Sequence, residues 1–129
     1  MVHQRLDFAL LAVEQIVNQA AKWHYTFDGQ LRVPLVIRML IGRGWGQGPT
    51  HSQNLQAIFA HIPGLKVVSP STPFDAKGLI ISSINDDNPV IFLSLLKVKS
   101  PIKRSPTLPS PYSGDFRDIS LKKLSVFEC

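Results

Sequence analysis

The fold class is decided by an almost continuous apolar run, Val33-Pro34-Leu35-Val36-Ile37-Arg38-Met39-Leu40-Ile41. A run of this length without polar alternation is typical of a strand that is buried on both faces. Such strands occur in parallel sheets, because helices cover both sides of those sheets. The stretch therefore predicts a layered α/β domain.

The segments around this run supply the helices and further strands that such a sheet needs. We expect helices over residues 7–23, 52–61 and 72–84, and further strands over residues 65–68 and 90–93. Helices and strands alternate at the spacing of βαβ units. The predicted architecture is therefore a parallel sheet with helices on both faces.

Two helix starts carry local signals. Asp7 is the expected N-cap of the first helix. Thr72, Pro73 and Asp75 predict a second start, with a capping hydroxyl, a proline in the first turn and an acid three residues after the cap. The expected apolar face of the first helix consists of Phe8, Leu11, Ala12, Ile16, Gln19, Ala20 and Trp23.

The composition changes after about residue 95. Residues 1–95 carry seven Lys or Arg and six Asp or Glu, whereas residues 96–129 carry seven and three, so most of the net charge of +5 comes from the last quarter. Four of the ten prolines lie within residues 101–111. We expect an ordered domain over residues 1–95 and a Pro/Lys-rich, divergent and poorly ordered tail over residues 96–129.

Several classes of protein are disfavoured by the sequence. No apolar run approaches the roughly 20 residues of a membrane-spanning helix, and the first residues lack the apolar core of a signal peptide. The single cysteine, Cys129, excludes a disulfide framework and a cysteine zinc cluster. The basic tail contains no recognisable nucleic-acid-binding module. We therefore expect an intracellular protein with neither a nucleic acid nor a membrane as its partner.

The first candidate site is the glycine-rich segment over residues 42–48 and the histidine that follows it. Its glycines allow a close approach to a ligand, but their spacing matches neither G-x-G-x-x-G nor a Walker loop. His51 lies after a strand and at the expected start of the second helix, where open α/β sheets bind ligands and where a neutral imidazole is favoured. The alternatives are a flexible connection and a half-exposed histidine without function.

Other polar residues offer weaker signals. His24 ends the first helix, where a cation is favoured, and is expected to be structural. Asp86 and Asp87 lie in the turn before the last strand and are expected to be solvated, although turn carbonyls there could hold a hard cation.

A set of motifs, in this order and spacing, resembles the pyrimidine-binding domain of β subunits of thiamine-diphosphate-dependent 2-oxo-acid dehydrogenases. This family includes components of pyruvate, branched-chain and acetoin dehydrogenases. The resemblance extends from residue 2 to about residue 93. Its motifs are Asp7-Phe8-Ala9, Glu14-Gln15-Ile16-Val17-Asn18-Gln19-Ala20-Ala21-Lys22, Val33-Pro34-Leu35-Val36-Ile37-Arg38, His51-Ser52-Gln53, Pro63-Gly64-Leu65-Lys66-Val67-Val68-Ser69-Pro70, Asp75-Ala76-Lys77-Gly78-Leu79 and Asp87-Asn88-Pro89-Val90.

The resemblance implies roles for particular residues. Phe8 matches the aromatic residue that packs on the aminopyrimidine ring of thiamine diphosphate, and Gln4 falls where the family often has a methionine lining that pocket. His51 matches the active-site histidine, which contacts the reaction intermediate and the lipoyl acceptor. The positions that match the surroundings of a structural potassium ion, held mainly by carbonyl oxygens, are Leu35, Ser83, Ile84, Asp86 and Asn88.

The resemblance also implies partners and an incomplete domain. The α subunit shares thiamine diphosphate and holds its diphosphate and magnesium, and a second β subunit completes a heterotetramer that passes acyl groups to a lipoyl-bearing acyltransferase. The catalytic glutamate of the family falls upstream of Met1, and no C-terminal transketolase domain is matched. We therefore expect a fragment of an enzyme of oxidative decarboxylation that is inactive alone.

Two hypotheses are open for the function, and two for the cellular compartment. The alternative to an enzyme fragment is a non-catalytic interaction protein that pairs with an α or β subunit. The compartment would be the cytoplasm in a bacterium and the mitochondrial matrix in a eukaryote.

Overall fold

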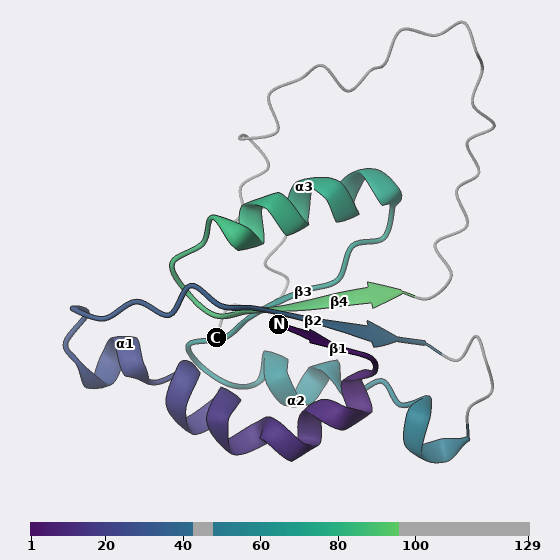
Figure 1. Ribbon diagram of the computed structural model, residues 1–129, viewed down its shortest axis with the longest axis horizontal. Coiled ribbons are helices and arrows are strands. Elements are labelled where there is room, and N and C mark those ends of the chain that lie inside the picture. Colours follow the sequence, from purple (N-terminus) through teal and green to yellow (C-terminus); the bar gives the residue numbers. More distant parts are fainter. Residues whose placement is uncertain (43–47, 96–129) are drawn as a thin grey trace, which may run out of the picture.

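The computed structural model describes residues 1–42 and 48–95 of the chain. Four parallel strands form one sheet in the order β1-β2-β4-β3 (Figure 1). The strands are β1 (Val2–His3), β2 (Val36–Ile41), β3 (Lys66–Val68) and β4 (Val90–Leu95). The predicted parallel sheet is confirmed, and β1 is a strand that the sequence did not predict.

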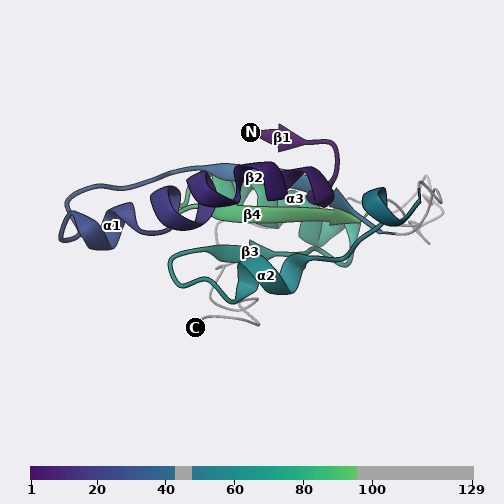
Figure 2. The same ribbon diagram turned by 90° about the horizontal axis from the view of Figure 1, so that it is seen from below.

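Helices cover both faces of this sheet, as predicted. The helix α3 (Pro73–Ile84) lies on one face, and η1 (Leu6–Ala12), η2 (Gln15–Ala20) and α2 (Gln56–Ala60) lie on the other (Figures 1 and 2). The short helix α1 (Trp23–Thr26) continues η2 beyond the ends of the strands (Figure 1). The arrangement is the layered α/β architecture that a sheet of buried parallel strands requires.

The two central strands differ in how completely they are buried. In β4, four successive residues from Val90 to Leu93 are at most 3% exposed, so this strand is buried on both faces. In β2, Ile37 and Met39 are buried but Arg38 is exposed. Two-sided burial therefore describes β4 fully and β2 only in part, because Val36 and Leu40, on the same face as Arg38, are half-buried, and Val36 packs on the cluster under α3.

The core forms two clusters, one on each side of the sheet. The cluster on the side of η1, η2 and α2 is the larger and consists of Leu6, Ala9, Ile16, Ala21, Ile37, Met39, Ile41, Phe59, Leu65, Ile91 and Leu93. The cluster under α3 consists of Val68, Leu79, Val90 and Phe92. Alternate residues of β4 enter opposite clusters, as the two-residue period of a strand requires.

The first helix departs from the regular helix predicted over residues 7–23. It starts as the 3₁₀ helix η1, and the buried Leu6 and Ala9 are three residues apart, which is the period of that helix. It widens into the π-helix η2, where the Ala21 N–H donates to the Ile16 carbonyl oxygen at 3.0 Å.

These changes of winding keep part of the predicted face against the core, at Ala12 and Ile16, and turn other predicted positions towards solvent. Leu11 is 89% exposed and Trp23 is 44% exposed, although both were expected to face the core, and Gln19 is exposed as well. Asp7 was also wrong as the N-cap, because it lies inside η1 and Arg5 precedes the helix.

The second helix begins later than predicted. The structure places a short 3₁₀ turn, η3 (Pro49–His51), before α2, which starts only at Gln56. His51 therefore ends a turn and does not begin a helix, so the argument from a helix N-terminus does not apply to it. Residues 43–47 of the predicted glycine-rich loop lie outside the described residues.

The start of α3 is confirmed in detail. The Asp75 N–H donates to Thr72 Oγ1 at 3.1 Å, and the Thr72 N–H donates to Asp75 Oδ2 at 3.2 Å. This reciprocal pair is a capping box, with Pro73 in the first turn. The signal was readable from sequence because all its contacts lie within four residues.

One close backbone approach joins the helical layer to the turn before β3. Gly64 has φ +93°, and a Cβ atom there would lie 2.0 Å from the Ala21 carbonyl oxygen. The Lys22 Nζ group donates to the Pro63 carbonyl oxygen at 2.8 Å beside it. The positive φ and the close approach both require glycine at position 64.

Two predictions concern a membrane-spanning helix and the tail. Among residues 1–42 and 48–95, no helix is long and apolar enough to cross a membrane. The expected tail over residues 96–129 lies outside the described residues.

Candidate functional site

The candidate site is formed where η1 meets the turn η3. The ring centroids of Phe8 and His51 lie 5.0 Å apart, with their planes inclined at 50°. Both side chains are half-buried. Phe8 comes from the helix that follows β1, and His51 lies beyond the carboxyl end of β2, so the fold brings together two residues that are distant in sequence. This end of a parallel sheet is where α/β proteins commonly bind ligands.

Several polar atoms near His51 are buried without a partner. Among the residues that the structure describes, Nδ1 of His51, Oγ of Ser52 and Oε1 of Gln56 are buried and make no hydrogen bond. Buried polar groups usually have partners, and an orphaned group calls for a ligand, a water or another chain. The three atoms lie within six residues of sequence, from the end of η3 to the start of α2, so they mark this segment as the polar side of the candidate site.

The third predicted residue of this site is Gln4, which lies four positions before Phe8 in the chain. Gln4 is exposed in the bend between β1 and η1. Its neighbour Arg5 is 4% exposed and donates from Nη1 to the Gly42 carbonyl oxygen at 3.1 Å. Sequence reasoning missed Arg5, because a single arginine before a helix gives no sign of burial.

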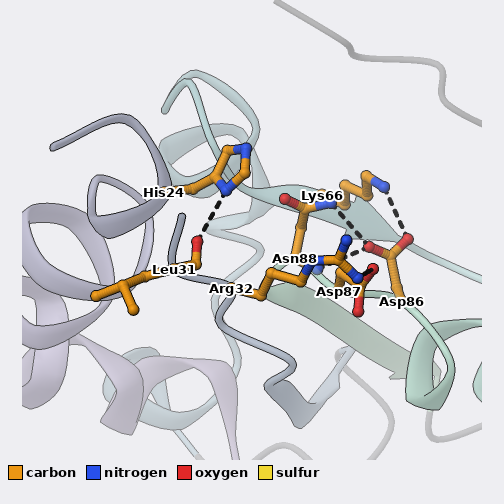
Figure 3. Close-up of polar contacts among 7 residues, drawn as sticks. All are labelled: His24, Leu31, Arg32, Lys66, Asp86, Asp87 and Asn88. Carbon is orange, nitrogen blue, oxygen red and sulfur yellow. Dashed lines mark hydrogen bonds and ion pairs between the residues drawn. The ribbon is translucent and has the colours of Figure 1, made fainter. Parts of the chain in front are cut away.

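A second polar cluster lies at the opposite end of the sheet, near the amino-terminal ends of β3 and β4 (Figure 3). The Lys66 Nζ group donates to Asp86 Oδ2 at 2.7 Å, and the Asn88 N–H and Nδ2 groups donate to Asp86 Oδ1 at 2.9 and 3.1 Å. Arg32 pairs with the exposed Asp87, and His24 Nδ1 lies 2.8 Å from the Leu31 carbonyl oxygen. The contacts to Asp86 and Asp87 hold the turn before β4, whereas the His24 contact holds the segment between α1 and β2.

The environment of Asp86 perturbs its acidity. Burial by itself would raise the pKa of the Asp86 carboxyl, but the hydrogen bonds from Lys66 and Asn88, with the positive charge of Lys66, outweigh it and lower the pKa below its ordinary value. The side chain of Asp86 is only 10% exposed. The expectation of a solvated Asp86 was therefore wrong, whereas the side chain of Asp87 is 56% exposed.

The five positions matched to a potassium site gather around this same turn. Ser83 and Ile84 end α3, and Asp86 and Asn88 follow in the turn. Leu35 lies beside them, because its carbonyl oxygen accepts from the Val90 N–H at 2.8 Å. In the described part of the chain, no group of three or more His, Cys, Asp or Glu side chains could hold a metal. A cation at this turn would depend mainly on carbonyl oxygens, because the Lys66 ammonium already pairs with the Asp86 carboxylate.

This fold and site agree with a family of known domains. Residues 1–95 match the family described as "Transketolase, pyrimidine binding domain". The match covers most of the chain, so the chain belongs to this family. The expected fold class, the transketolase-like pyrimidine-binding domain, is thereby confirmed.

Three relatives indicate which members of this family the chain is similar to. The chain is 53% identical over 87 residues to the β subunit of acetoin:2,6-dichlorophenolindophenol oxidoreductase from Cupriavidus necator, covering 67% of this chain and 26% of that protein. It is 52% identical over 87 residues to the β subunit of the pyruvate dehydrogenase E1 component from Rickettsia bellii, covering 67% and 27%. A mitochondrial β subunit of the same component, from Caenorhabditis elegans, is 48% identical, covering 67% and 25%. The chain thus spans about a quarter of each relative's length, as expected of a fragment.

Proposed function

We propose that this chain contributes the pyrimidine-facing half of a thiamine-diphosphate site in the β subunit of a 2-oxo-acid or acetoin dehydrogenase. The observation that carries the proposal is the contact between Phe8 and His51 at 5.0 Å. An aromatic face beside an imidazole with a buried, unpartnered nitrogen suits a flat heterocycle that stacks and forms hydrogen bonds. The family match over residues 1–95 supports a pyrimidine as that heterocycle.

Each residue of this site would have a separate role. Thiamine diphosphate, when bound, supplies the ylid carbon that makes decarboxylation of a 2-oxo acid feasible. Phe8 would pack on the aminopyrimidine ring, and Gln4 would border the pocket from the bend before η1. His51 would orient the acyl group and hold a proton during its transfer to lipoamide. The diphosphate and magnesium would be held by the α subunit.

Cofactor binding tests this proposal. The chain is mixed with an α subunit of a pyruvate or acetoin dehydrogenase, and thiamine diphosphate is titrated in by calorimetry. Phe8→Ala should weaken binding by about tenfold, because it removes an aromatic stacking contact. Phe27→Ala is the matched control, since Phe27 makes its ring contact with Trp23, at 6.2 Å, outside the site. Equal affinities for the two variants, or no binding by the wild-type mixture, would contradict the proposal.

Partner subunits are the second part of the proposal. Large apolar side chains stay exposed on the helical layer, including Leu11 at 89% and Tyr25 at 87%. Exposed apolar groups of this size suit association with another subunit. We expect an α subunit, a second β subunit and a lipoyl-bearing acyltransferase as partners, and the same surface would serve a non-catalytic interaction protein. Elution of the chain as a monomer after co-expression with an α subunit would argue against both versions.

A potassium ion at the turn before β4 is the third part. Leu35, Ser83, Ile84, Asp86 and Asn88 gather there, and carbonyl oxygens suit a hard cation. The test compares thermal unfolding in potassium, sodium and tetramethylammonium chloride at equal ionic strength. A transition temperature that is higher only in potassium is expected, and equal temperatures in all three salts would exclude the ion.

A further inference from the structure

We infer that Asp7 is a positioning residue for His51. Asp7 lies in η1 one residue before Phe8, and its Oδ1 atom accepts a hydrogen bond from the Gln53 N–H at 3.3 Å. Gln53 lies two residues beyond His51. The bond therefore ties the segment that carries His51 to the helix that carries Phe8, and it joins residues 46 positions apart in the chain.

The need for such a tether follows from the state of the imidazole. A histidine in a functional site is usually oriented by a hydrogen bond to the ring nitrogen that does not react. Nδ1 of His51 is buried and makes no such bond to the part of the chain that the structure describes. The ring position must then come from packing against Phe8 and from the backbone that carries the histidine. Phe8 packs against the ring of His51, and Asp7 bonds to the backbone two residues beyond it. These two residues are adjacent in η1.

The chemistry of the contact supports a role beyond packing. Asp7 is half-buried, and its carboxylate reaches the backbone N–H group of a segment without helix or strand structure, residues 52–55. A carboxylate oxygen is a stronger acceptor for a backbone N–H group than a neutral oxygen at the same distance. A single such bond can hold a loop in one conformation, which a functional histidine requires. The assignment of a catalytic role to His51 rests on the proposed function, but the tether itself does not.

Nuclear magnetic resonance on the full 129-residue chain, without cofactor or partner, tests the tether. Asp7→Ala should increase the exchange rate of the Gln53 amide by about tenfold and move the His51 Cε1–H resonance towards that of an exposed histidine, while amides of β4 keep their protection. Glu14→Ala is the matched control, because Glu14 lies in the same helical segment and accepts a bond from the nearby Gln19 side chain, at 3.0 Å. It should change neither signal.

A conservative variant provides a second test in case Asp7→Ala unfolds the domain. Asp7→Asn keeps an acceptor oxygen at the same position, so it should restore most of the His51 signal and increase Gln53 exchange by only about threefold. If Asp7→Ala loses the protection of β4, the asparagine variant decides the question. Unchanged Gln53 exchange in the folded variant, or an equal change in Glu14→Ala, would overturn the inference. The resonance experiment contains no cofactor. If the chain failed to bind thiamine diphosphate in the calorimetric test, the proposed function would be contradicted, but the evidence for the bond between Asp7 and Gln53 would not change.

Discussion

Asp86 shows how one residue can make the stability of the domain depend on pH. Its pKa in the folded chain is lowered despite burial, so the folded state favours the ionised carboxylate more strongly than the unfolded state does. This contribution is complete above the ordinary carboxyl range near pH 4 and is lost as the pH falls through the lowered pKa. We expect Asp86→Asn to lower the free energy of unfolding by about 1–2 kcal/mol at pH 7. The deficit should shrink towards pH 3.

Urea unfolding of wild type and Asp86→Asn at both pH values measures this difference. Asp87→Asn serves as the control, because its ion pair with Arg32 is exposed and should contribute little. A deficit of the same size at pH 7 and pH 3 would show that the carboxylate charge does not cause it.

Gly64 is the second residue whose identity the fold dictates. Gly64→Ala would place a methyl group 2.0 Å from the Ala21 carbonyl oxygen at a positive φ, so the turn and the end of η2 would have to separate. We expect a loss of about 3 kcal/mol in unfolding free energy, measured by urea denaturation. Gly48→Ala is the control for a positive φ alone, since no atom of the described residues lies within 4 Å of its Cβ position. A similar loss in both variants would mean that the contact with Ala21 contributes nothing.

At the scale of the element, α3 is the part of the molecule with the most local support. Thr72→Ala removes the hydroxyl that accepts from the Asp75 N–H and should cost about 1 kcal/mol of unfolding free energy. Thr26→Ala, at an exposed position in the last turn of α1, should change it by less than about 0.5 kcal/mol. Chemical denaturation of both variants decides whether the capping box stabilises the domain as its geometry indicates.

The same scale explains which elements could be predicted from the sequence. The capping box of α3 and the apolar strands β2 and β4 were predictable, because their signals are local or continuous. The first helix was not predicted in phase, because its buried residues follow a three-residue period at Leu6 and Ala9 and a five-residue step from Ile16 to Ala21. No regular helical period contains both spacings, so contact with the sheet determines them.

The candidate site was partly predictable for a similar reason. The position of His51 after a strand is a property of the chain order, so the sequence alone indicates it. The contacts that hold His51 could not be predicted, because Asp7 and Phe8 reach its segment across the fold. The place of Asp7 before an apolar segment indicates a capping role, and only the tertiary structure shows its bond to Gln53.

At the scale of the whole molecule, we expect the purified chain alone to reduce no 2,6-dichlorophenolindophenol with acetoin or pyruvate in the presence of thiamine diphosphate. Cofactor chemistry needs a complete, preorganised site, and the chain spans only 26% of the Cupriavidus necator relative. Dye bleaching followed at increasing chain concentration measures this. Turnover that depends on thiamine diphosphate and is lost in His51→Ala would contradict the expectation.

The strand order has a consequence for how the chain acquires its structure during synthesis. β4 is the last strand in the part of the chain that the structure describes, yet it lies between β2 and β3 and is the hydrogen-bonded neighbour of both. Until residue 95 has left the ribosome, β2 can pair only with the two-residue strand β1, and β3 has no partner among the described strands. The apolar segments 33–41 and 65–68 therefore stay largely unpaired until then. Pairing strands that are far apart in sequence makes folding slow, and the intermediates expose apolar surface that is prone to aggregation. Cells that make this domain should therefore depend on chaperones that shield those two segments until β4 arrives.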